Sequence, residues 1–596
     1  MKKRLLAAAL ACVLLSGCGE TAGTPVFSEA QTEEKVIAYV PLDDRPDNVE
    51  RVEYLAESLG YTLEMPELDR HRTRLDHQPL NENGTQYGDL AALYEWVLDQ
   101  EAAGCDRYIL SLDQLLSGGL VNSRHTAETL TVTLSNGRSV TDAELLEELL
   151  AALAEDENNQ VWLLDSVMRL APTVGYAGFG LEEYNALRSY GAEARPGLSG
   201  GELTVENIAA DYRLGGDGTV LDPANFGLTE DQVTDYLAAR QRKLLLSDRM
   251  LETVRGGAYE NFRVLIGIDD SSAEECAQKN EIAYLRSRLR EGDALLSGVD
   301  DLAFKAVAKL YLEEISWTGG TVAVRYYGGA ENEPACAYDF QSLDTIMEEH
   351  LDFFGLTRSA NYLAAGLQVL VLTQPQVQEN SKVYYTQLIQ ALKECREKGW
   401  PTILIDAGNG KYGTAFHDAL TEETELGWLL SYAGFLDMAI VTGTALSHGV
   451  ARYAHLVKGE TTVGQEQAFA KTLADSIIKD FCYKNVVRED LLAYIRNDLG
   501  GSPDNFWDPE IDREAVLERL EKGMANAAGK VVKNLERSNY IISLERNDEN
   551  DGLAGWGGIM LTNYRFPWDR AFEIGMDIEV GDFTKPHKSV LGVYYQ

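Results

Sequence analysis

The sequence predicts an α/β protein, with a (β/α)8-like barrel core followed by helical and small β additions. Two observations predict this class. From residue 36 onward, short apolar, often β-branched runs alternate with amphipathic helical stretches, as is typical of β/α units with parallel strands. About eight or nine such units can be counted, which fits a closed barrel with one extra element. Open, doubly wound parallel sheets produce the same local pattern and remain the alternative.

The individual elements follow from hydrophobic periodicity. The runs expected to be strands are Val36–Val40, Tyr108–Leu112, Val161–Leu164, Val264–Ile268, Ala294–Ser297, Val322–Tyr326, Val369–Leu372, Ile403–Ile405 and Ala439–Thr442. The helical periods between them are Asn48–Leu59, Asp89–Glu101, Glu144–Ala154, Ala277–Arg290, Leu302–Glu314, Tyr384–Lys398 and Glu423–Tyr432. Thr141 and Glu144 have the spacing of a capping box, which predicts a helix N-terminus there.

Composition changes along the chain predict the domain organisation. A core at 35–455 contains a Gly-rich interruption near 175–227, which we interpret as an insertion able to cover a site. A disordered surface loop is the alternative for this segment. Residues 456–538 show only helical periods, and residues 539–596 contain alternating runs that predict a small β appendage.

The first residues predict export and lipid anchoring. Lys2, Lys3 and Arg4 precede a short apolar stretch and then Ser16-Gly17-Cys18, the arrangement of a bacterial lipoprotein signal. We expect residues 1–17 to be a signal peptide, Cys18 to carry the lipid, and residues 18–34 to be a flexible tether. The protein would then lie on the outer face of the cytoplasmic membrane, because multiple acyl chains make such an anchor stable.

Charge and metal-ligand spacing restrict the partners. The chain has 53 basic and 95 acidic residues, a formal charge of −42, so we expect no nucleic-acid partner. Its cysteines form no C-x-x-C motif and its histidines no H-x-x-x-H or H-x-H pair, which makes a His/Cys metal centre unexpected. No cofactor is predicted, although carboxylates could bind a divalent cation.

Polar side chains follow many of the expected strands. Because the carboxyl ends of parallel strands meet at the ligand-binding face, these residues are predicted to form one acidic site. The candidates are Asp43, Asp44, Arg45, Asp113, Arg169, Asp269, Asp270, Asp406 and Asn409, with a further pair at Asp300 and Asp301 and with Trp317 as a ring for stacking on a sugar. Each aspartate alone could equally be a helix N-cap. Arg45 and Arg169 could bind a substrate carboxylate or orient the aspartates.

Asp269 and Asp270 are the predicted catalytic pair. They follow Val264–Ile268 and precede Ser271-Ser272, where the backbone has left the strand and both side chains can reach one pocket. Two nearby carboxylates separate their proton affinities, one keeping a proton and one ionised, as glycoside hydrolysis requires. The same pair could hold a divalent metal.

A set of short motifs is distributed over the chain. They are Pro41-Leu42-Asp43-Asp44-Arg45-Pro46-Asp47-Asn48, Ser111-Leu112-Asp113, Gly118-Gly119-Leu120-Val121-Asn122-Ser123-Arg124, Met168-Arg169, Pro172-Thr173, Asp269-Asp270-Ser271-Ser272, Val324-Arg325-Tyr326, Gly443-Thr444-Ala445-Leu446, Phe566-Pro567-Trp568 and Phe572-Glu573. In this combination the chain resembles a bacterial family of unknown function, domain of unknown function 4127. The chain departs from the family pattern at Gly267-Ile268 and at Asp406-Ala407-Gly408-Asn409. The resemblance spans nearly the whole chain after the signal but implies no reaction.

A weaker similarity suggests a reaction. A strand that ends in Asp-Asp, with Trp-Thr-Gly downstream, resembles barrel β-N-acetylglucosaminidases. That analogy implies that Asp269 orients an acetamido group and Asp270 protonates the leaving oxygen. We therefore expect a glycoside hydrolase acting on an extracellular glycan. The alternatives are a carboxylate/metal-dependent hydrolase of another class and a non-catalytic lipoprotein that binds glycans.

Overall fold

The computed structural model describes residues 26–27, 35–434, 438–458, 460–504, 506–538, 555–556, 558–581 and 583–584. The expected signal peptide 1–17 and the lipidation site Cys18 lie outside the described residues. Of the expected tether 18–34, only Val26–Phe27 is described; this strand, β1, pairs in parallel with β15 (Glu460–Thr461). No helix among the described residues is long and apolar enough to cross a membrane.

The parallel strands form two open sheets. Sheet one contains six strands in the order β3-β2-β4-β7-β8-β9, and sheet two contains five in the order β11-β10-β12-β13-β14. Sheet one consists of β2 (Lys35–Val40), β3 (Tyr61–Glu64), β4 (Arg107–Ser111), β7 (Gln160–Val167), β8 (Phe262–Ile268) and β9 (Ala294–Ser297). Sheet two consists of β10 (Gly320–Tyr327), β11 (Leu356–Arg358), β12 (Leu367–Leu372), β13 (Thr402–Asp406) and β14 (Ser431–Gly434). All neighbouring strands within each sheet are parallel.

In both sheets, the chain first adds a strand on one side of the first strand and then continues on its other side. In each, the second strand along the chain pairs at the edge beside the first, and the third strand lies on the first strand's other side. This creates a topological switch point between β2 and β4 in sheet one, and between β10 and β12 in sheet two. Ligands of doubly wound sheets bind outside the carboxyl ends of the strands at such points.

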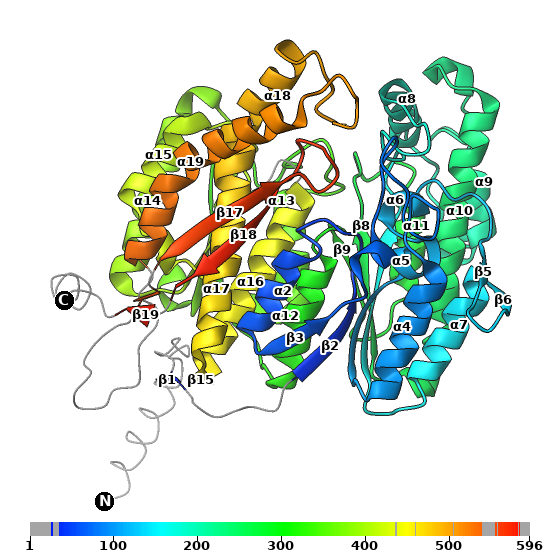
Figure 1. Ribbon diagram of the computed structural model, residues 1–596, viewed down its shortest axis with the longest axis horizontal. Coiled ribbons are helices and arrows are strands. Elements are labelled where there is room, and N and C mark those ends of the chain that lie inside the picture. Colours follow the sequence, from blue (N-terminus) through cyan, green and yellow to red (C-terminus); the bar gives the residue numbers. More distant parts are fainter. Residues whose placement is uncertain are drawn as a thin grey trace, which may run out of the picture.

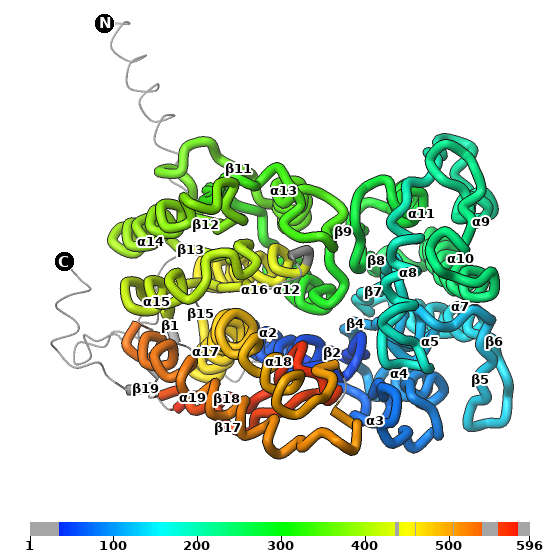
Figure 2. The backbone as a smooth tube through the Cα atoms, turned by 90° about the horizontal axis from the view of Figure 1, so that it is seen from above, coloured from blue at the N-terminus to red at the C-terminus, as the bar shows by residue number. Residues whose placement is uncertain are grey.

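Helices cover both faces of both sheets, so the molecule has five layers (Figures 1 and 2). The middle layer, shared by the two sheets, contains α2 (Glu50–Ser58), α12 (Leu302–Glu314), α13 (Leu343–Phe353) and α16 (Met438–Lys458). The outer layer on sheet one contains α4 (Leu90–Ala103), α5 (Leu112–Ser117), α7 (Asp142–Leu153), α10 (Glu230–Thr253) and α11 (Lys279–Arg288). The outer layer on sheet two contains α14 (Ser381–Lys398), α15 (Gly413–Glu423), α17 (Val463–Ser476), the π-helix Ile477–Val487, α18 (Arg488–Asn497) and α19 (Arg513–Ser538).

Alternation along each strand divides the core into these layers. Ile37 and Tyr39 of β2 contact the middle helices, whereas Ala38 and Val40 contact the outer helices of sheet one. Since both faces of each strand are covered, the strands read as continuous apolar runs, which is typical of buried parallel sheets.

The remaining elements are short. They are α3 (Leu68–His71), α6 (Leu120–Ser123), the hairpin β5 (Thr131–Thr133) and β6 (Ser139–Thr141), α8 (Leu181–Ala192), α9 (Val205–Asp211), the antiparallel pair β17 (Ile559–Arg565) and β18 (Gly575–Val580), and the antiparallel pair β16 (Gly555–Trp556) and β19 (Phe583–Thr584). Helices α8 and α9 occupy the predicted insertion 175–227. The capping box of Thr141 and Glu144 is confirmed at the start of α7.

A closed (β/α)8 barrel is not what the chain forms, whereas the alternative of doubly wound parallel sheets fits the structure. The physical reason is that a strand covered on both faces has the same apolar sequence in either architecture. The decisive strands are β3 and β11, which periodicity did not predict. They occupy one edge of each sheet, and the opposite edge strands are β9 and β14, so neither sheet closes.

One expected strand and one expected helix were wrong. Ala439–Thr442 lies at the start of helix α16 rather than in a strand, and the last strand of sheet two is Ser431–Gly434, inside a segment expected to be helical. Helix α16 is buried between the sheets, with Val441, Ala445 and Val450 at most 1% exposed. A short apolar window from such a helix cannot be distinguished from a buried strand by periodicity.

Candidate functional site

A cavity of about 590 Å³ lies at the carboxyl ends of the strands of sheet one. Residues after β2, β7, β8 and β9 form one wall, and the connection that follows β10 contributes Tyr338 to another. The segment between β17 and β18 contributes Trp568 and Glu573. The C-terminal appendage, which is far away in sequence, therefore closes the site that sheet one begins (Figure 1).

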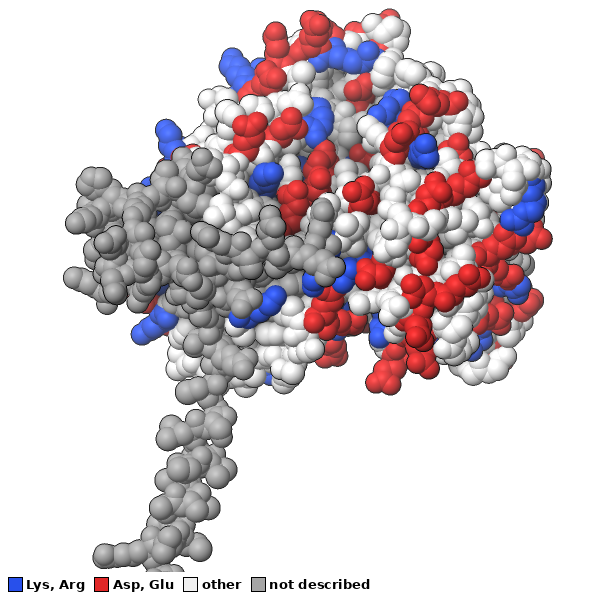
Figure 3. All heavy atoms as spheres, turned by 60° about the horizontal axis from the view of Figure 1, so that its bottom comes forward, with Lys and Arg blue, Asp and Glu red and all other residues white. Residues whose placement is uncertain are grey.

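The cavity is mixed in charge rather than acidic. Among the described residues, its lining includes five arginines and six acids. The arginines are Arg45, Arg124, Arg169, Arg488 and Arg570, and the acids are Asp269, Asp270, Asp300, Asp339, Asp504 and Glu573. On the face of the molecule in Figure 3, Asp and Glu side chains outnumber Lys and Arg side chains. The sequence predicted an acidic site, but the cavity lining also contains arginines, because position in the sequence did not reveal where the arginines gather.

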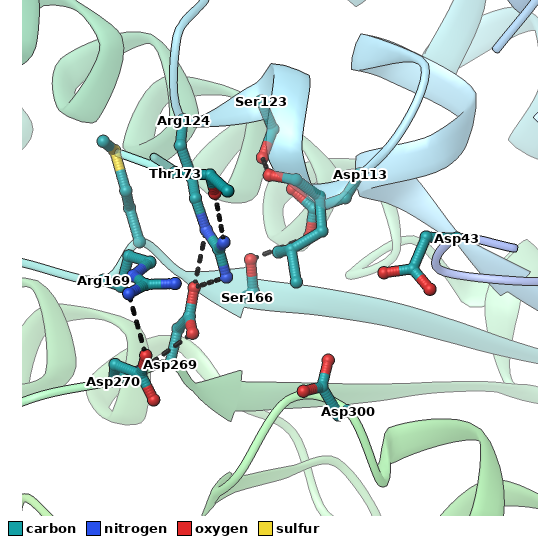
Figure 4. A network of polar contacts seen from close by, with 12 residues as sticks. Asp43, Asp113, Ser123, Arg124, Ser166, Arg169, Thr173, Asp269, Asp270 and Asp300 are labelled. Atoms are coloured by element: carbon teal, nitrogen blue, oxygen red, sulfur yellow. Dashed lines mark hydrogen bonds and ion pairs between the residues drawn. The ribbon is translucent and has the colours of Figure 1, made fainter. Parts of the chain in front are cut away.

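Asp269 is buried at the end of β8 and held by Arg124. The Arg124 Nε donates to Asp269 Oδ2 at 2.9 Å, and its Nη2 forms an ion pair with the same oxygen. The backbone N–H of Asp270 donates to Asp269 Oδ1 at 2.8 Å. Figure 4 shows Arg124 coming from the β4 side of the sheet, with its Nη1 bonded to Thr173 at 2.9 Å. Both Asp269 oxygens are therefore engaged within the protein.

Asp270 faces the cavity, with 27% of its side chain exposed. Its Oδ2 lies 3.1 Å from Arg169 Nη2 (Figure 4). The same nitrogen donates to the Tyr184 hydroxyl at 3.0 Å. Tyr184 belongs to α8, in the predicted insertion, so that segment does contribute to the site. Burial raises the pKa of Asp270, and the negative charge of Asp269 adds to this, while Arg169 opposes it. The two neighbouring aspartates consequently occupy different electrostatic environments.

Arg45 joins the carboxyl ends of β2 and β9. Its Nη2 lies 2.7 Å from Asp43 Oδ2 and 2.5 Å from Asp300 Oδ1. Its guanidinium also lies 4.8 Å from the ring centroid of Trp568 and 4.0 Å from Glu573 Oε2. Asp43 is fully buried and so orients Arg45, whereas 26% of the Asp300 side chain is exposed.

Glu573 is a buried acid at the base of the cavity. Its Oε1 accepts a hydrogen bond from the backbone N–H of Asp47 at 3.2 Å. Burial and the nearby Asp47 carboxylate raise the pKa of Glu573 to about 8, despite Arg45 and Lys484. Glu573 is therefore protonated at neutral pH, in contrast to an ordinary surface glutamate.

Some predicted site residues lie just behind the cavity wall. Asp44 is buried and accepts hydrogen bonds from Trp568 Nε1 at 2.9 Å and from the Thr73 backbone at 3.0 Å. Asp113 forms an ion pair with Lys243 at 2.7 Å and accepts from the Ser166 hydroxyl at 2.7 Å. These aspartates brace the loops on which the cavity residues lie, and neither lines the cavity itself.

The other predicted residues are divided between sheet two and its far end. Asn409, after β13, lines the cavity in a left-handed conformation with φ 48°. Asp406 ends β13, where it accepts from the Gly408 backbone at 3.0 Å and from the Tyr432 hydroxyl at 3.3 Å. Trp317 precedes the amino end of β10 and packs against Tyr453 at 5.9 Å. The structure thus places Trp317 at the end of sheet two opposite to the site, where it cannot stack on a ligand in this cavity.

Sequence reasoning did not select Arg124, Trp568, Arg570 and Glu573 as site residues. The nearest signal was the family resemblance, because Arg124, Trp568 and Glu573 all lie in matching motifs. A search for polar residues at strand ends could not find them, because Arg124 follows a helix and the other three lie in the C-terminal appendage. Among the described residues, no three His, Cys, Asp or Glu side chains gather in a geometry that could hold a metal ion.

The fold and the site define an α/β protein with two open parallel sheets and a charged cavity at a carboxyl edge. A family model described as "Protein of unknown function (DUF4127)" matches residues 37–577, and the chain belongs to that family. No match was found among the curated proteins or among the solved structures. Most of the motifs on which the family resemblance rests lie in the cavity lining or contact the residues that form it.

Proposed function

We propose that the protein is an extracytoplasmic, lipid-anchored glycoside hydrolase whose general acid is Asp270. The observation that carries this proposal is the contrast between two adjacent carboxyls at the end of β8. Asp269 is held by Arg124, whereas Asp270 is partly exposed to the cavity with a raised pKa. Pairs of titratable groups whose environments differ in this way are typical of acid and base partners.

In the proposed reaction, the Asp270 carboxyl donates its proton to the glycosidic oxygen as the bond from the anomeric carbon breaks. A water molecule adds its oxygen to that carbon and gives up a proton to a second carboxylate. Asp300 fits this second role because it is partly exposed in the same cavity and its charge is stabilised by Arg45. Glu573 fits it less well, since a pKa of about 8 leaves it protonated at neutral pH.

Arg124 and Arg169 have positioning roles in this proposal. Arg124 holds Asp269 in place through its hydrogen bonds, and the negative charge of Asp269 adds to the raised pKa of Asp270. Because both oxygens of Asp269 already accept hydrogen bonds, we do not assign it the orientation of a substrate acetamido group. The proposal therefore keeps the acid role expected from sequence but does not depend on a substrate-assisted mechanism.

The test is aglycone release from a panel of neutral, acidic and N-acetylated aryl glycosides by full-length protein in detergent. We expect Asp270→Asn to lower the rate about 100-fold or more, as the loss of a general acid does. Glu274→Gln is the matched control, because Glu274 is an exposed acid on the same loop and should leave the rate unchanged. Equal rates for Asp270→Asn and the control would contradict the proposal.

Glycan binding without catalysis is the second candidate. The observation that favours it is that several cavity acids already pair with arginines, an arrangement that also suits a rigid binding site. In that case no aryl glycoside would be cleaved by the wild-type protein, and Asp270→Asn would weaken sugar binding without changing any turnover.

A further inference from the structure

The cavity arginines differ in how well they are paired. Arg45, Arg124 and Arg169 each have a carboxylate within 3.1 Å. Arg570, from the segment between β17 and β18, lies 3.7 Å from Asp504, and its Nε has no hydrogen-bond partner among the described residues. Arg488, the fifth cavity arginine, lies 3.5 Å from Glu489 and likewise has an Nε without a partner among the described residues. Of these two poorly paired arginines, Arg570 has the more distant carboxylate.

The surroundings of Arg570 are unfavourable for its charge. Burial lowers its pKa, and Arg169 and Arg45 lower it further, whereas Asp504 acts in the opposite direction. A buried donor without a partner is destabilising, so such groups require an explanation. An anionic group of a ligand in the cavity would supply the missing counter-charge.

Arg45 and Arg169, the two arginines that the sequence predicted could bind a substrate carboxylate, already pair with groups of the protein. Arg45 is held by Asp43 and Asp300, and Arg169 by Asp270 and Tyr184. Binding a substrate anion there would require breaking these contacts. Arg570 could accept an anion without any such loss, because only one distant carboxylate faces it.

We propose that the cavity selects a sugar that carries a carboxylate, and that Arg570 binds this group. The planar guanidinium fork matches a carboxylate in a bidentate geometry, whereas a neutral sugar hydroxyl leaves part of it unpaired. This inference rests on the proposed function for its substrate class, but it concerns binding and can be measured separately.

The experiment is calorimetric titration of full-length protein in detergent with D-glucuronate, D-galacturonate and N-acetylneuraminate. The methyl ester of each sugar is the matched neutral ligand, and D-glucose 6-phosphate tests a different anion. We expect at least one free acid to bind tenfold or more tightly than its ester. Arg570→Gln should abolish this preference. Arg519→Gln, at an arginine on α19 that pairs with Asp490, should retain it.

Arg570→Lys distinguishes a loss of carboxylate binding from a loss of folding. It keeps the charge but not the fork, so we expect weaker acid binding at an unchanged thermal midpoint. The inference is overturned if no acid is preferred over its ester, if the preference survives Arg570→Gln, or if the sugar phosphate binds more tightly than every carboxylate. If the preference holds while no aryl glycoside is cleaved, the hydrolase proposal fails and the carboxylate site stands.

Discussion

The two sheets have the same strand order, yet their carboxyl edges differ in chemistry. Sheet one opens at its switch point into a cavity with several arginines and acids. At the switch point of sheet two, Gly328 packs against Thr373, whose carbonyl accepts a hydrogen bond from the Tyr412 hydroxyl at 2.7 Å. Gly328, Thr373 and Tyr412 thus pack closely at this point of sheet two.

This difference teaches that strand order supplies a location for a site, whereas side chains decide whether the site exists. In sheet one, the loops after β2 and β8 carry charged residues into the cavity, among them Arg45 and Asp270. In sheet two, the residues directly after β10 and β12 are Gly328 and Thr373, which pack closely against each other. The loop after β10 then crosses to sheet one, where Tyr338 and Asp339 line the cavity.

Removing a buried cation from sheet one should have the largest effect. We expect Arg124→Met to lower the free energy of unfolding by about 3 to 5 kcal/mol, because it leaves Asp269 as an uncompensated buried charge. Arg358→Met is the counterpart in sheet two; Arg358 is 32% exposed and should cost about 1 kcal/mol or less. Urea unfolding measures both. Equal losses would show that the ion pair at β8 is no more important than one at the surface.

Substitution of an aspartate after a strand should affect cleavage in sheet one but not in sheet two. Asp270→Asn should lower glycoside cleavage about 100-fold. Asp406→Asn, at the end of β13 in sheet two, should leave cleavage within about twofold of wild type, because Asp406 does not line the cavity. Initial rates on the best substrate of the panel decide this. A comparable loss in Asp406→Asn would mean that the catalytic site extends to Asp406.

Adding one methyl group at the switch point of sheet two should destabilise that sheet. A Cβ on Gly328, where φ is +132°, would overlap Thr373 Oγ1 and lie 2.7 Å from the Thr373 carbonyl oxygen. We expect Gly328→Ala to cost about 2 kcal/mol or more, combining backbone strain with overpacking. Gly84→Ala controls for positive φ alone, since no atom lies within 4 Å of its Cβ position. Similar thermal midpoints for the two variants would contradict the close packing.

Buried carboxyls in the cavity and in sheet two should change the pH dependence of stability. An acid whose pKa is raised on folding holds its proton in the folded state, so stability falls as pH rises between the unfolded and folded values. For Glu573 this window runs from about 4.5 to about 8, and for Asp406 from about 3.8 to about 6. Glu573→Gln should therefore flatten the stability profile up to pH 8, and Asp406→Asn only up to pH 6. Urea midpoints between pH 4 and 9 test this, and unchanged slopes would exclude buried protonated carboxyls.

The sequence by itself determined where several strands and helices of the core begin and end. Ala294–Ser297 is a strand with the expected bounds, and Leu302–Glu314 is a helix with the expected bounds. Asp269 and Asp270 were expected at the end of a strand, and they lie there. These predictions succeed because apolar periodicity and residue preferences at helix ends depend on neighbours along the chain.

Only the tertiary structure decided how the strands were divided between two sheets, and which charges met. A strand buried on both faces does not encode its neighbours, so the edge positions of β3 and β11 could not be predicted. Arg570 and Glu573 line the same cavity as Asp270 and Asp300, although several hundred residues separate them in sequence. No local pattern specifies such a placement. Site residues near strand ends, including Arg45 and Arg169, were therefore predictable, whereas Arg124 and the residues of the C-terminal appendage depended on packing between distant segments.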